Sequence, residues 1–119
     1  MYEKVIDSML YYLSEQETAL RKEAAAMAAD FRVDEGNFLK IRANVFSIFK
    51  AVLETAVKIK GRNGAALDFF ATKLRDIPSS WRSALSAADA ADTALVEKLK
   101  LQSVAEIESA FAQRMEATK

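Results

Sequence analysis

The chain has 119 residues, 51% of them hydrophobic, and its 17 basic and 17 acidic side chains leave no net charge. This length fits a single domain, which we expect to span residues 1–119. The even charge balance gives no support for nucleic-acid binding. Because the sequence holds neither cysteine nor histidine, disulfides, thiolate-bound zinc, Ser-His-Asp triads and Glu-x-x-His di-iron sites are excluded.

The N-terminal residues do not form a basic region followed by an apolar stretch, so they do not read as a secretory signal. The longest uncharged, apolar-leaning stretch is residues 24–29. A membrane-spanning helix needs about 20 such residues. We therefore expect a cytoplasmic protein that does not enter the membrane.

The first predicted helix covers residues 1–32, because apolar residues recur there at steps of three and four. They are Tyr2, Val5, Ile6, Met9, Leu13, Leu20, Ala24, Met27 and Phe31. A turn follows, in which the carboxylate of Asp34 suits the N-cap of the next helix. Val33 and Phe38 have the spacing of a hydrophobic staple around that cap.

The second predicted helix covers residues 34–60 and ends at Gly61, a residue suited to helix C-termini. Its main apolar stripe is Phe38, Ile41, Val45, Ile48, Phe49, Val52, Ala56 and Ile59. A second stripe, rotated by about 100°, is Leu39, Phe46, Leu53 and Val57. Either this helix is central and covered by two neighbours, or the second stripe is a candidate interface for another chain. The sequence leaves both explanations open.

The third predicted helix covers residues 63–88, with Asn63 as its N-cap and a kink at Pro78. Its apolar stripe passes Pro78 without losing register, which favours one kinked helix or a tight interruption over two separate helices. The stripe then changes direction near residues 88–92, which predicts a turn and a last helix over 91–117. One continuous helix over 79–117 is the alternative.

Four helices joined by short loops predict an antiparallel up-down-up-down four-helix bundle. No spacing unites a nucleophile with a base, so we expect no enzyme, no cofactor and no metal site. The predicted function is protein–protein association or scaffolding, either as a homodimer or by presenting a helix face to a partner, through Leu39, Phe46, Leu53 and Val57. The alternative is a small apolar ligand held in a cavity near Phe70, Leu74 and Trp81.

Overall fold

A computed structural model describes residues 2–118, and all regular secondary structure in that range is helical. The helices are α1 (Glu3–Ala29), α2 (Val33–Lys60), α3 (Gly64–Asp76), α4 (Ser79–Ala87) and α5 (Ala91–Glu116). This confirms the predicted all-α class. The ends of the predicted domain, residues 1 and 119, lie outside the described residues.

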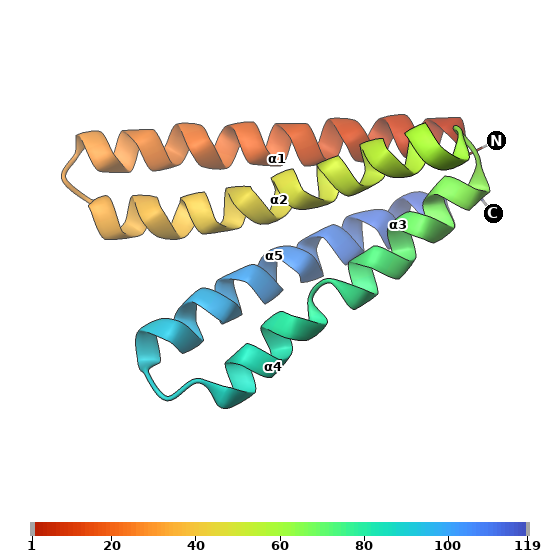
Figure 1. Ribbon diagram of the computed structural model, residues 1–119. Helices are drawn as coiled ribbons and strands as arrows, with labels where there is room; N and C mark the ends of the chain where they lie inside the picture. The colour runs from red at the N-terminus through yellow and green to blue at the C-terminus, as the bar shows by residue number, and fades with distance from the viewer. Residues whose placement is uncertain (1, 119) are drawn as a thin grey trace.

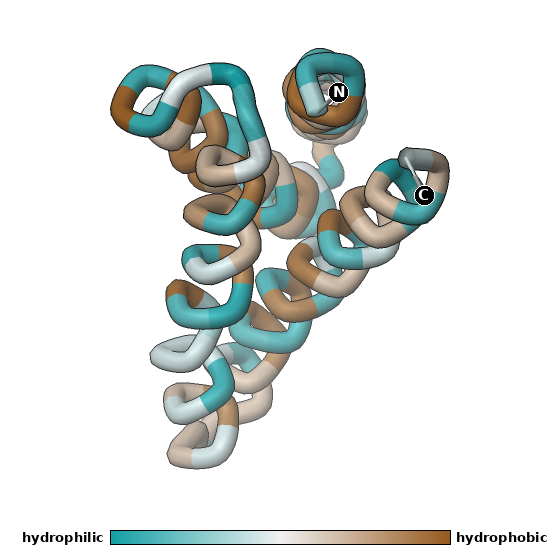
Figure 2. Tube along the Cα trace, turned by 90° about the vertical axis from the view of Figure 1, so that its right-hand side faces the viewer, coloured by the Kyte–Doolittle hydropathy of each residue, from teal (hydrophilic) through white to brown (hydrophobic). Residues whose placement is uncertain are grey.

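The helices form two groups that diverge from each other (Figure 1). Helices α1 and α2 lie side by side, while α3 and α4 lead away from them and α5 returns beside these two. Figure 2, seen from the end where both termini lie, shows α1 end-on and the second group extending away from it. The radius of gyration is 15.5 Å. A compact domain of this length has about 13.5 Å, so the molecule is less compact than an average domain.

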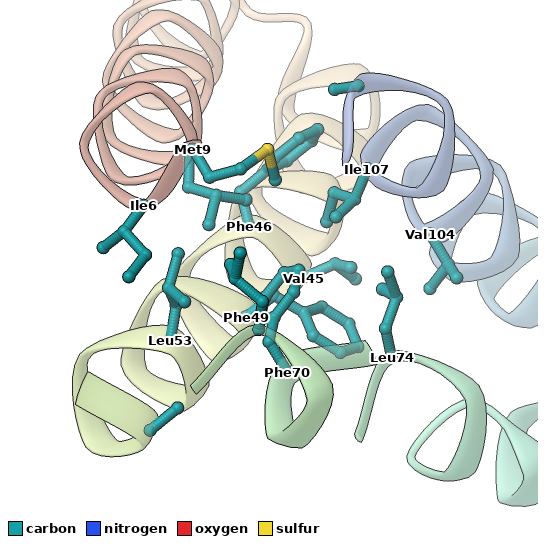
Figure 3. Packing of buried hydrophobic residues seen from close by; sticks show 14 of the residues in the cluster. Ile6, Met9, Val45, Phe46, Phe49, Leu53, Phe70, Leu74, Val104 and Ile107 are labelled. Atoms are coloured by element: carbon teal, nitrogen blue, oxygen red, sulfur yellow. The ribbon is translucent and has the colours of Figure 1, made fainter. Parts of the chain in front are cut away.

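The hydrophobic core lies where α1, α2, α3 and α5 meet (Figure 3). Phe70 of α3 is fully buried there, with its ring centroid 6.3 Å from that of Phe49 and 5.1 Å from that of Phe111. Both pairs meet edge to face, a favourable arrangement for aromatic rings. Helix α4 differs from the other helices, because none of its residues is buried.

The turn between α1 and α2 closes α1 with a Schellman motif. The Arg32 N–H donates to the Met27 carbonyl at 2.8 Å, and the Phe31 N–H donates to the Ala28 carbonyl at 3.2 Å. This motif places Phe31 at a φ of 59°, a left-handed conformation in which glycine is usual. The turn therefore holds a bulky residue in a backbone conformation that disfavours it.

The start of α2 differs from the prediction. The helix begins at Val33, so Asp34 lies within its first turn and the predicted N-cap at Asp34 is wrong. Val33, placed inside the helix and exposed, is not in the staple position before the cap. Three residues later, a Cβ atom on Gly36 would lie 2.9 Å from the backbone carbonyl oxygen of Ala24. Glycine at this position therefore allows α1 and α2 to approach closely.

The predicted helix over 63–88 is divided into α3 and α4 by Ile77 and Pro78. Asn63 caps α3 as predicted, because its side chain accepts a hydrogen bond from the Ala65 N–H at 3.0 Å. Proline has no N–H to continue the helical hydrogen bonds, so the segment shows a tight interruption of two residues, and the predicted kink within one helix is not confirmed. The predicted turn near residues 88–92 is confirmed, and a continuous helix over 79–117 is excluded, because α4 ends at Ala87 and α5 begins at Ala91.

Candidate interaction surface

The prediction that the second stripe of α2 forms an exposed interface is wrong. Phe46 and Leu53 are fully buried, and Leu39 and Val57 are half-buried against the core. The reason is the position of α1, which lies along this stripe and contacts α2 more extensively than any other helix does. Tyr12 of α1, for example, meets the Phe46 ring edge to face at 6.0 Å.

The main stripe of α2 is the one that is partly uncovered. In the C-terminal half of the helix, Val52 of this stripe borders a hollow that Phe69 and Ile77 also line, so this side faces α3. Towards the N-terminus the same side carries Phe38, Ile41 and Ile48, which we call the open face of α2. Ile48 is 39% exposed, and the other two are half-buried. The second group of helices diverges from the N-terminal part of α2, in which Phe38 and Ile41 lie, and Ile48 lies near the middle of this helix.

A similar set of apolar residues lies in the N-terminal half of α5. Leu95 is 38% exposed, and Val96 and Leu99 are half-buried. We call these three residues the open face of α5. Helical spacing places them on the side of α5 that also carries Glu106, which contacts α2. Two apolar faces are therefore left partly uncovered where the helix groups separate.

Helix α4 packs against α5, and their contact includes a charged group. The Lys100 ammonium lies 5.4 Å from the Trp81 ring centroid and 3.3 Å from a carboxylate oxygen of Glu97. The other carboxylate oxygen of Glu97 is buried and has no hydrogen-bond partner within residues 2–118. A buried acceptor without a hydrogen-bond partner is unfavourable, so the Glu97 carboxylate is only partly satisfied in the contact between α4 and α5.

An ion pair joins α2 to α5 near the point where they separate. The terminal nitrogen Nη2 of Arg42 donates to both carboxylate oxygens of Glu106, at 3.0 and 2.8 Å. The Arg42 Nε atom is buried and finds no acceptor in the part of the chain that the structure describes. The pair therefore holds the two helices together with one of its donors unused.

A second polar group fastens α1 to α5. The Arg114 guanidinium lies 5.0 Å from the Tyr12 ring centroid, and its Nε atom donates to the Ser8 hydroxyl at 2.7 Å. Burial, followed by the charge of Glu106, raises the pKa of Tyr12 above its ordinary value. The phenol is therefore neutral at physiological pH and serves as a structural contact.

The residues of the predicted ligand cavity do not enclose a common space. Phe70 and Leu74 belong to the core, and Trp81 is half-buried beside α5. A hollow of about 200 Å³ next to Leu74 is bordered by α3, α4 and α5, and Trp81 is not among the residues that line it. The structure thus places Trp81 outside the hollow that lies next to Leu74.

Among residues 2–118, the acidic side chains form no group that could hold a metal ion. No helix in that range is both long and apolar enough to cross a membrane. No protein-family model, curated protein or solved structure gives a significant match to this chain.

Proposed function

We propose that this chain is a non-catalytic association module that binds another protein chain through the open faces of α2 and α5. The observation that supports this proposal is the partial exposure of aliphatic residues on both helices, with Ile48 near the middle of α2 and Leu95 near the start of α5. Single exposed apolar residues are normal, but a contiguous group favours a protein contact. The proposal keeps the up-down-up-down arrangement, in which the chain reverses between α1 and α2, between α2 and α3, and between α4 and α5.

The charge distribution is consistent with a protein partner. Acidic and basic residues balance over the whole chain, so a nucleic acid or an anionic membrane surface is not part of the proposal. Aliphatic side chains such as Ile48 and Leu95 offer contact area that does not depend on salt. Cytoplasmic location is proposed from the sequence alone, and cell fractionation tests it.

Photo-crosslinking in cells tests the association. A photoreactive amino acid at Ile48 lies on the open face of α2, whereas the same group at Tyr11, which is 69% exposed, lies outside both open faces and is the matched control. We expect one discrete adduct from position 48 that is lost when Leu95→Asp places a charge on the opposite face. Folding of each variant is checked by circular dichroism. Equal labelling from positions 48 and 11 would contradict the proposal.

Binding of a small apolar ligand near Trp81 stays a prediction. The specific observation needed to favour it, a hollow lined by this tryptophan, is not present among the hollows described above. Quenching of its fluorescence by hydrophobic ligands remains the direct test, because it is the only tryptophan in the chain.

A further inference from the structure

We infer that the chain bound at the open faces is a second copy of this protein, with Phe31 of each copy anchored against the open faces of the other. This inference rests on the proposed function and names its partner. Three observations carry it: the exposed area of the monomer, the conformation of Phe31, and the place of both features at one end of the molecule.

The first observation is the area. The chain exposes 7044 Å² to solvent. A monomer of this mass typically exposes about 6,400 Å², so roughly 600 Å² are in excess. A stable two-chain interface of standard size buries about 800 Å² on each partner. The excess is therefore about three quarters of the area that one isologous contact of standard size would bury on each copy.

The second observation concerns Phe31, which is unfavourable in the isolated chain for two reasons. Its side chain is 92% exposed, and its φ of 59° is a conformation that favours glycine. The Schellman hydrogen bonds at this turn would form equally well with glycine, so the local structure does not require an aromatic residue. An exposed aromatic ring on a residue with positive φ is unfavourable twice over, and no contact within the turn compensates for it. We take this as a sign that the ring contacts another molecule.

The third observation is the location. The turn that holds Phe31 and the diverging N-terminal ends of α2 and α5 all lie at the end opposite the termini (Figure 1). In the proposed dimer, a two-fold axis at this end brings the turn of each copy to the N-terminal parts of α2 and α5 of the other, where Phe38, Ile41 and Leu95 lie. Self-complementary contacts of this kind are the commonest in homo-oligomers. Because the net charge is zero, two copies approach without overall repulsion.

The test measures the mass of the purified full-length chain by light scattering and sedimentation over a range of concentrations. We expect a species of twice the 13.2 kDa chain mass. Phe31→Gly removes the anchor and should weaken the dimer at least about thirtyfold. Ile48→Asp should also give a monomer. Ile59→Ser, an exposed apolar residue at the opposite end of α2, is the matched control and should leave the dimer intact.

Phe31→Gly has a second readout that a purely structural role would not give. Because glycine adopts a positive φ without steric conflict, the dilute monomer should melt about 4 °C higher while the dimer is lost. A monomeric wild-type protein at high concentration would overturn the inference. So would a dimer that both Phe31→Gly and Ile48→Asp leave unchanged. If the purified chain is monomeric but still forms its adduct in cells, only the second copy is ruled out and the association module stands.

Discussion

Replacement of Phe70 by alanine tests whether the hydrophobic core holds helices α1, α2, α3 and α5 together. The side chain is fully buried and meets Phe49 and Phe111 edge to face. Its removal leaves a cavity bordered by residues of three helices, which cannot all move inward together. Such a substitution typically lowers the free energy of unfolding by about 3–5 kcal/mol.

That loss is large relative to the total stability. A chain of this length is expected to have an unfolding free energy of roughly 6–18 kcal/mol. Its unfolding entropy is about 0.25 kcal/mol per kelvin, so each kcal/mol lowers the melting temperature by about 4 °C. We therefore expect Phe70→Ala to remain folded and to melt about 12–20 °C lower than the wild-type protein.

The neighbouring Phe69 provides the control, because it has the same chemistry at a different position on α3. It is half-buried, and its ring lies 5.5 Å from the Lys73 ammonium near the surface. Phe69→Ala should lower stability by about 1 kcal/mol, and Tyr11→Ala by less than about 0.5 kcal/mol. Urea and thermal unfolding, followed by circular dichroism at one fixed oligomeric state, give the three values.

The relative losses in unfolding free energy of the three variants test the packing of α3. Equal losses for Phe69→Ala and Phe70→Ala would mean that α3 does not present Phe70 to the core. A larger loss for Phe69→Ala would mean that α3 is rotated by about 100° about its axis. Either result would refute the packing described here.

Two further substitutions test local contacts. Gly36→Ala should lower the free energy of unfolding by about 1–2 kcal/mol in urea, because the new methyl group meets the Ala24 carbonyl. Replacing glycine by alanine in a helix without such a neighbour usually raises this free energy by about 0.5–1 kcal/mol, and a gain of that size would contradict the close approach. The raised pKa of Tyr12 means that the folded chain holds the phenol proton more tightly than the unfolded chain. This contribution to stability is present below the ordinary tyrosine pKa of about 10 and is lost as pH rises through the raised value. Tyr12→Phe should therefore make the fall in urea midpoint above that pH shallower, and an unchanged fall would count against the assignment.

The two stripes of α2 show how far the sequence alone can lead. Helical spacing identifies both stripes and indicates that the helix is apolar over about half its circumference. It cannot say which stripe is covered, because that depends on where α1 and α3 lie. The structure covers Phe46 and Leu53 with α1 and leaves Ile48 partly exposed. The residues of the predicted interface therefore lie in the core or against it, and the partly exposed Ile48 belongs to the other stripe.

Pro78 illustrates a second limit. The apolar stripe keeps its register through this residue because Ile77 and Pro78 both retain right-handed helical backbone angles. The helix is nevertheless divided, since proline cannot donate the hydrogen bond that would continue it. Periodicity reports the direction of side chains, and it is insensitive to one missing backbone donor.

The turn at Phe31 shows a third limit, because sequence rules place glycine after a helix. A phenylalanine at this position gives no signal for a left-handed residue, and Asp34 gives a strong but misleading signal for a cap. The left-handed conformation accompanies the Schellman hydrogen bonds that Phe31 and Arg32 donate at the end of α1. The glycine that matters for the contact between α1 and α2 is Gly36, which lies inside the following helix.

The weak packing of helix α4 bears on the order in which parts of the molecule unfold. It contains nine residues, none of them buried, and it packs mainly against α5. An isolated helix of that length is marginal in water, so its order depends on this single neighbour. Amide hydrogens of Ser79–Ala87 should consequently exchange with deuterium well before those of α2, through opening events that leave the remaining helices folded.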